Sequence, residues 1–167
     1  MTRLLQQFLK IAFLTGKPYD LPANAATLQL AVTLSFLTYV VATWQVYSPG
    51  SAIGHALLDI ALAGVVLYFA LAIVGKLARF SQAFSGLCGA NAVLNAVTLP
   101  VIYSRVNNTD PEAQQAHLID FFFLVWSISV VAHIIRYSFD TNIPISIAAS
   151  VGYIILALYV FELFFPG

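Results

Sequence analysis

Long apolar stretches separated by short polar segments make up most of the chain. A helix that crosses a bilayer needs about 20 mostly apolar residues. Five stretches meet this requirement, over residues about 25–47, 53–75, 82–103, 118–139 and 143–165. Turn-forming residues lie between them, with Ser48-Pro49-Gly50 after the first stretch and Asp140-Thr141-Asn142 before the fifth. The pattern predicts an all-α protein, a single polytopic transmembrane helix bundle over residues 25–167.

The third stretch is the least uniform, because it contains Asn91, Asn95 and Pro100. If it re-enters the membrane from one side, only four helices span. Small residues spaced four apart allow close helix approach, and the stretch has two such pairs, Ser85/Gly89 and Gly86/Ala90. They predict a central or oligomer-facing helix whose two amides bond to a neighbouring helix; the alternative is a helix that lines a polar pathway.

Residues 1–16 have a different periodicity. At 100° per residue their apolar side chains share one face and their polar side chains share the other, namely Leu4, Leu5, Phe8, Leu9, Ile11 and Ala12 against Arg3, Gln6, Gln7 and Lys10. The apolar region of a signal peptide would be uniformly apolar. We therefore expect an amphipathic helix in the plane of the membrane interface, either a simple anchor or a docking helix for a partner.

Composition agrees with a membrane class. The chain is 60% hydrophobic and 8% charged with a mean hydropathy of +0.89, whereas soluble domains are about 25% charged. The formal net charge is zero, which argues against a nucleic-acid partner. Cys88 is the only cysteine, so the sequence contains neither an internal disulfide nor the Cys/His spacing of a zinc site.

The basic residues predict an orientation. With five spans, six of the seven lie on one side, namely Arg3, Lys10, Lys17, Lys76, Arg79 and Arg136, and only Arg105 lies on the other. Basic residues near span ends favour the cytoplasm. We expect a cytoplasmic N-terminus, an outside C-terminus and, from the short loops, a bacterial inner-membrane protein. With four spans the last two helices would invert.

Ionisable residues inside spans are rare and are functional candidates. His55 and Asp59 share one face of the second span, and His117 and Asp120 share one face of the fourth. Glu162 lies about one turn before the end of the fifth span. The five-span topology places all of these groups in the outer third of the membrane.

Such a cluster has several interpretations. Two histidines with carboxylates are adequate ligands for a divalent metal ion, an Asp–His pair can pass a proton, and two histidines can ligate haem. Alternatively, the histidines cap helices in water and the aspartates interact with helix dipoles. Asp59 is the deepest member. It shares a face with Ala56, Ala63 and Ala70, which predicts that it points into the bundle.

Two function hypotheses remain, and neither is an enzyme, because the sequence has no phosphate-binding loop, zincin motif or serine-nucleophile elbow. The first is a small scaffold or accessory subunit in contact with lipid, which associates with itself or with a larger membrane complex. The second is a metal-ion or proton-linked transporter or binding protein that uses the outer His/Asp/Glu cluster.

The predicted layout of five spans, with an inside N-terminus and an outside C-terminus, resembles that of Yip1-type membrane proteins. Gly152-Tyr153 in the fifth span echoes that family's Asp-Leu-Tyr-Gly-Pro type of segment, which is otherwise absent. The resemblance implies a role in membrane organisation or trafficking, or an accessory role in bacteria. It assigns no functional residue.

Overall fold

The computed structural model describes residues 2–107 and 116–165. In this part of the chain there are six α-helices: α1 (Thr2–Ala12), α2 (Ala25–Thr43), α3 (Pro49–Ile73), α4 (Phe80–Asn107), α5 (Ala116–Phe139) and α6 (Ile143–Phe164). Short 3-10 turns follow α1 and α3, at Pro18–Asp20 and Leu77–Arg79. Helices α2 to α6 are long and apolar enough to cross a membrane. The prediction of an all-α membrane helix bundle is therefore confirmed.

Local sequence signals explain most helix ends. The Ser48 side chain accepts the backbone N–H of Ser51, and Pro49 occupies the first turn, so α3 begins four residues before the predicted span. The Asn142 side chain accepts the N–H of Ile145 in the same way at the start of α6. Helix α4 continues through Pro100 for 28 residues, which is long enough for a full crossing rather than a re-entrant segment.

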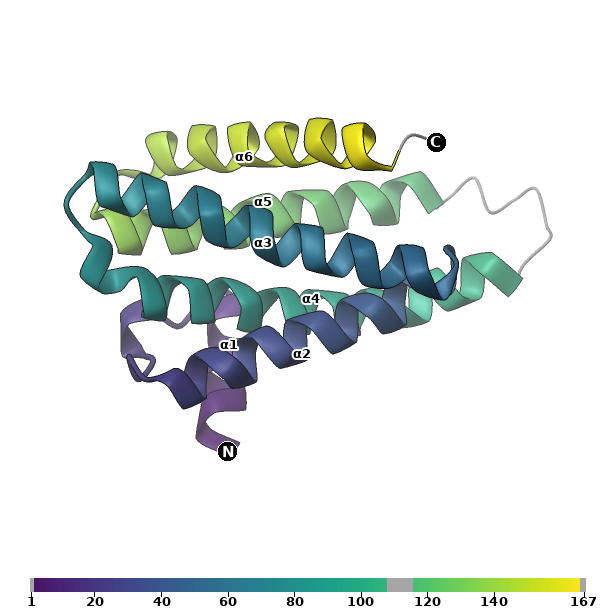
Figure 1. Ribbon diagram of the computed structural model, residues 1–167, viewed down its shortest axis with the longest axis horizontal. Coiled ribbons are helices and arrows are strands. Elements are labelled where there is room, and N and C mark those ends of the chain that lie inside the picture. Colours follow the sequence, from purple (N-terminus) through teal and green to yellow (C-terminus); the bar gives the residue numbers. More distant parts are fainter. Residues whose placement is uncertain (1, 108–115, 166–167) are drawn as a thin grey trace.

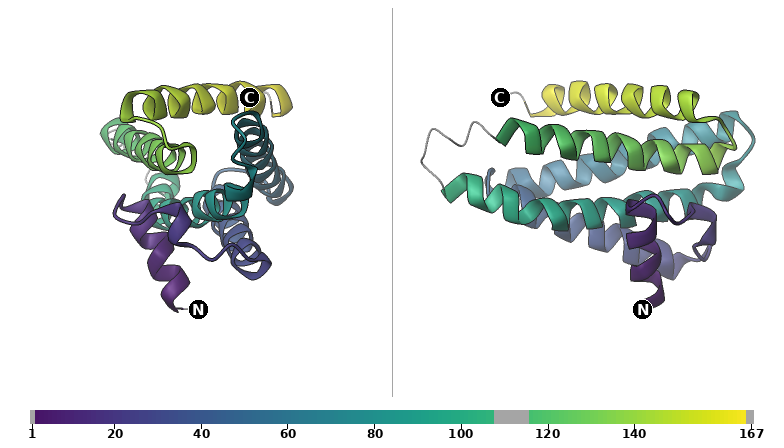
Figure 2. Two further views of the ribbon diagram at one scale, coloured as in Figure 1. Left: turned by 90° about the vertical axis from the view of Figure 1, so that its left-hand side faces the viewer. Right: turned by 180° about the vertical axis from the view of Figure 1, so that it is seen from behind.

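Helices α2 to α6 lie side by side and alternate in direction, whereas α1 runs across them (Figure 1). The end where α2, α4 and α6 begin carries Lys76, Arg79 and Arg136, and we call it the basic end. The end where α3 begins is called the opposite end. Figure 2 shows that α6 lies on the far side of the bundle from α1. The alternation agrees with the topology expected from the sequence.

At the basic end, ionic contacts join the connection between α3 and α4 to the connection between α5 and α6. The Lys76 ammonium donates to Asp140 Oδ2 at 2.9 Å and to the Phe139 carbonyl at 2.6 Å. Arg79 donates to the same Asp140 oxygen at 2.7 Å and to the Ser138 carbonyl at 3.2 Å. Asp140 has a φ of 51°, a left-handed conformation that ends α5. We call Lys76, Arg79 and Asp140 the basic-end clasp.

Helix α1 is docked on the bundle of its own chain. Phe8, Ile11 and Ala12 are buried, and a Cβ added at Gly89 of α4 would overlap the Phe8 ring. Trp126 of α5 donates its indole N–H to the Ala12 carbonyl at 2.8 Å. Part of the apolar face of α1 therefore meets protein, while Leu5 and Leu9 stay exposed. The interfacial position of α1 stays a prediction.

The small-residue face of α4 packs within the chain. Gly86 lies close to Ile11 and to the segment after α1, and Ser85 and Ala90 are fully buried. An oligomer contact through Gly86 and Gly89 would therefore require α1 to detach from α4. Oligomerisation itself stays a prediction.

Candidate functional site

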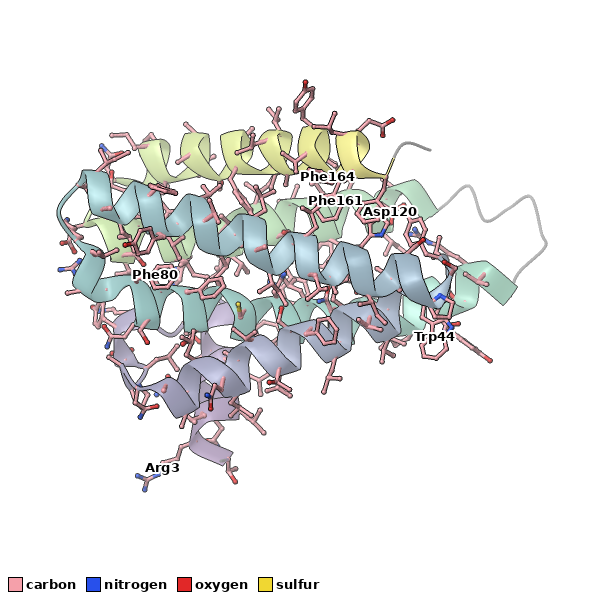
Figure 3. The ribbon with its side chains drawn as sticks, viewed as in Figure 1. Arg3, Trp44, Phe80, Asp120, Phe161 and Phe164 are labelled. Atoms are coloured by element: carbon pink, nitrogen blue, oxygen red, sulfur yellow. The ribbon has the colours of Figure 1, made fainter. Side chains whose placement is uncertain are left out.

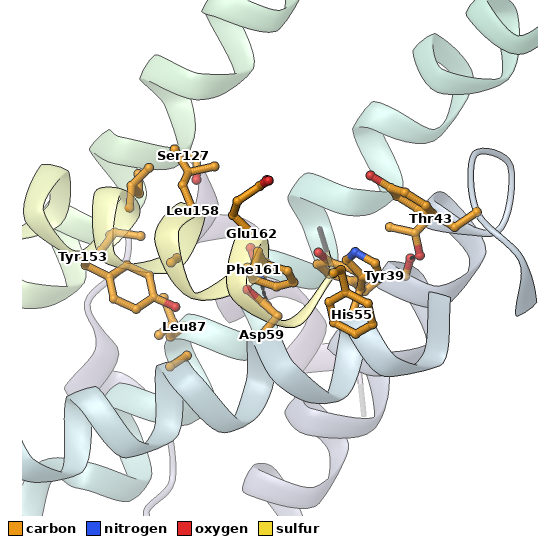
Figure 4. A pocket seen from close by; sticks show the side chains of 17 residues that line it. Tyr39, Thr43, His55, Asp59, Leu87, Ser127, Tyr153, Leu158, Phe161 and Glu162 are labelled. Atoms are coloured by element: carbon orange, nitrogen blue, oxygen red, sulfur yellow. Dashed lines mark hydrogen bonds between the residues drawn. The ribbon is translucent and has the colours of Figure 1, made fainter. Parts of the chain in front are cut away.

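The interior of the bundle contains a cavity of about 530 Å³ whose walls come from all five long helices. Its lining includes three members of the predicted cluster, His55, Asp59 and Glu162 (Figure 4). This volume is within the range of small-molecule sites, about 300–1,000 Å³. We call it the carboxylate cavity.

Asp59 is the polar centre of this cavity. It lies on α3 and is half-buried, and its Oδ2 accepts a hydrogen bond from Asn91 Nδ2 of α4 at 3.1 Å. Ala56 and Ala63, on the same face of α3, are buried, so Asp59 points into the bundle as their spacing predicted. Within residues 2–107 and 116–165, Asp59 takes part in no ion pair. The Asp59 carboxylate thus faces a cavity inside the bundle, and its hydrogen-bond donor in the described residues is the neutral amide of Asn91.

Much of the remaining cavity wall is aromatic. The rings belong to Tyr39, Tyr47, Tyr153, Phe161 and Phe165. Aromatic faces carry negative charge density and attract cations. The lining residues that the structure describes include neither lysine nor arginine. The Asp59 carboxylate and the ring faces together make the cavity suited to a positively charged ligand.

His55 belongs to an aromatic stack that covers the cavity at the opposite end of the bundle. Its ring centroid lies 4.6 Å from that of Tyr47 and 3.9 Å from that of Phe165, with nearly parallel planes. Its Nδ1 lies 2.7 Å from the Ser51 carbonyl, and because a carbonyl only accepts, Nδ1 carries the proton. Gly54 allows this packing, since a Cβ there would lie 2.9 Å from Phe165 Cζ. We call Tyr47, His55 and Phe165 the aromatic stack.

The rest of the predicted cluster lies elsewhere. Arg105 of α4 donates to Asp120 Oδ1 at 2.5 Å, and Asp120 does not line the cavity. The side chain of His117 lies outside the described residues. In the part of the chain that the structure describes, no three His, Cys, Asp or Glu side chains are grouped so that they could hold a metal ion. His55, Asp59 and the exposed Glu162 therefore line one cavity without converging on a common point, and Asp120 lies apart from them.

Among the functional candidates of the third span, Asn91 lies in the cavity wall and Asn95 does not. The buried Nδ2 of Asn95 has no hydrogen-bond partner in the described residues. Sequence reasoning missed Tyr39 and Tyr153 as cavity residues. One signal was present: Tyr153 lies about ten residues into its span, too deep for the interfacial belt where tyrosines are usual.

A second cavity of about 380 Å³ adjoins the first. The two share Ala63, Leu87, Val131 and Tyr153 as lining residues. The second is mainly apolar and reaches Thr141, next to the basic-end clasp. We call it the apolar cavity. Together the two cavities extend from the aromatic stack to the basic end.

Comparisons of the chain with protein-family models, with curated proteins and with solved structures found no match. The resemblance to Yip1-type proteins therefore stays a prediction. The geometry of the two cavities is the basis for assigning a function.

Proposed function

We propose that this protein is a proton-linked membrane transporter that binds a small organic cation in the carboxylate cavity. The observation that carries the proposal is the Asp59 carboxylate, which faces a 530 Å³ space with one amide donor and no ion-pair partner in the described residues. Ionisable groups in such positions mark substrate and proton pathways in membrane proteins.

Electrostatics supports a coupled exchange. An isolated carboxylate in a low-dielectric interior is costly unless a proton or a cation neutralises it. The neutral amide of Asn91 contributes a hydrogen bond without cancelling the charge. A proton and a cationic ligand would occupy the same Asp59 oxygens. Binding of one therefore favours release of the other, which links ligand movement to proton movement.

The chemistry of the walls favours an organic cation over a metal ion. A metal ion needs several convergent ligands, and the described residues do not provide three such side chains together. An organic cation is bound by one carboxylate, by ring faces such as those of Tyr39 and Phe161, and by apolar surface for its body. The apolar cavity extends that surface.

The two cavities also support transport rather than binding alone. Together they lie along the direction in which the helices would cross a bilayer, with the aromatic stack at one end and the basic-end clasp at the other. If the aromatic stack and the basic-end clasp opened one at a time, Asp59 would be exposed to each side of the membrane in turn. Lys76, Arg79 and Arg136 at the basic end support a cytoplasmic position for that end under the positive-inside rule. The short loops support a bacterial inner-membrane protein.

The test uses wild-type protein and Asp59→Asn in liposomes that contain pyranine, a pH-sensitive dye. Tetraphenylphosphonium, a lipophilic cation, is added outside. Uptake in exchange for protons should raise the internal pH with wild-type protein. Asp59→Asn should reduce the initial rate about tenfold or more, because it removes both the exchangeable proton and a coulombic attraction to the cation, which is about 4 kcal/mol at ~4 Å and an effective dielectric constant of ~20. Asp120→Asn is the matched control and should retain the wild-type rate, since Asp120 does not line the cavity.

Thermal unfolding in detergent should show that both variants are folded. An equal dye response for wild type, Asp59→Asn and protein-free liposomes would overturn the proposal. The scaffold or accessory-subunit hypothesis would then be the better account.

A further inference from the structure

A groove on the outer surface of the bundle lies apart from both cavities, where the chain after α1 crosses α5. It consists of two adjoining hollows of about 220 and 530 Å³, both lined by Leu14 and Ser129. Arg136 and His133 line the smaller hollow, and Trp126 lines the larger. We call this the lateral groove. It shares no lining residue with the carboxylate cavity.

The two ends of the lateral groove differ in chemistry. One end carries the exposed Arg136 guanidinium at the basic end of the bundle. The other is lined by Val97, Phe122 and Val125, which are apolar. Arg136 and Phe122 are 14 residues apart on α5, which corresponds to about 21 Å of helical rise. One leaflet of a bilayer, headgroups included, has about the same thickness, roughly 20–22 Å.

A second cation lies beside the polar end. The Lys17 ammonium and the Arg136 guanidinium are each 5.4 Å from the centroid of the Tyr137 ring. Neither forms an ion pair within the described residues. Asp20 is near, but its carboxylate accepts the backbone N–H of Lys17 at 3.2 Å. Arg136 lines the groove and Lys17 does not, but both positive charges lie beside the same Tyr137 ring, at the end of the groove where a headgroup would lie.

Hydrogen bonds hold the wall of the groove in place. The Trp126 indole donates to the Ala12 carbonyl at 2.8 Å, and His133 Nε2 lies 2.6 Å from the Gly16 carbonyl. The Phe13 and Trp126 rings pack with their centroids 5.4 Å apart. These contacts fix the chain on both sides of Leu14, so the groove is formed before any ligand binds.

We propose that the lateral groove binds one anionic phospholipid. Its phosphate lies at Arg136 and Lys17, and one acyl chain follows α5 past Trp126 to Phe122. A single anionic lipid matches both the cationic end of the groove and its length from Arg136 to Phe122, which is that of one leaflet. The site is independent of transport through the carboxylate cavity.

The test is native mass spectrometry of detergent-purified protein with equimolar dioleoyl phosphatidylglycerol and dioleoyl phosphatidylcholine, which differ in headgroup charge and share acyl chains. Wild-type protein should retain phosphatidylglycerol preferentially. Arg136→Gln should weaken that retention about fivefold, the effect of one basic residue at an anionic membrane surface. Arg136→Lys should keep most of it, which also shows that the position tolerates substitution.

Arg3→Gln is the matched control, because it removes one positive charge from the exposed start of α1, where the side chain points away from the bundle (Figure 3). It should leave retention unchanged. Ser129→Phe fills the middle of the groove without changing charge and should lower retention of both lipids. Equal retention of both lipids by wild type, or equal losses for Arg3→Gln and Arg136→Gln, would overturn the proposal.

Discussion

The docking of α1 can be tested at Gly89, where the α4 backbone meets the Phe8 ring. Gly89→Ala adds one methyl group at a point that the ring already occupies. Phe8 is 1% exposed, so the ring cannot turn aside into open space. Such overpacking costs about 1–3 kcal/mol. That range corresponds to an undocked population of α1 about 5 to 150 times larger than in the wild type.

Hydrogen exchange of the α1 backbone amides, followed by mass spectrometry in detergent, measures this population directly. Exchange of the residues around Phe8 should accelerate by the same factor in Gly89→Ala. Gly152→Ala in α6 is the matched control, because no atom lies within 4 Å of the added Cβ. It should not change exchange in α1.

A double-mutant cycle identifies the cause. Phe8→Ala removes the ring, so adding Gly89→Ala to it should cost little more, which gives a coupling energy of about 1–3 kcal/mol. Wild-type exchange rates in Gly89→Ala, or additive effects of the two substitutions, would refute the docking of Phe8 over Gly89.

Two further predictions concern the two ends of the bundle. Hydrogen bonds from Arg79 and Lys76 lower the pKa of Asp140 to about 2, below its unfolded value of about 3.9. The clasp therefore stabilises the fold above pH ~4, and this contribution is lost as the pH falls through ~2. Wild type should have a higher Tm than Asp140→Asn at pH 7, with the difference narrowing toward pH 2; a gap independent of pH would contradict this. At the opposite end, Gly54→Ala should displace the Phe165 ring from His55 and cost about 0.5–1.5 kcal/mol of stacking. The His55 ring resonances in NMR should shift toward those of an unstacked histidine, and unchanged resonances would argue against the stack.

The sequence by itself determined the helices and their order. Each apolar segment is long enough to cross a bilayer, and this property depends only on the segment and its solvent. Helix starts are equally local, because Ser48 and Asn142 satisfy backbone N–H groups three residues further along the chain. The small residues on the same face of α3 also predicted that Asp59 points into the bundle.

Only the tertiary structure decided which side chains meet. Asp59 and Asp120 have similar sequence contexts, each beside a histidine on one helix face, yet one faces a cavity and the other pairs with Arg105. The apolar face of α1 fits lipid and protein equally well by hydropathy, and its contact with Gly89 depends on how α1 crosses α4. Hydropathy measures whether a segment prefers lipid or water. The partner of each side chain depends instead on the rotation and offset of neighbouring helices, which no single segment encodes.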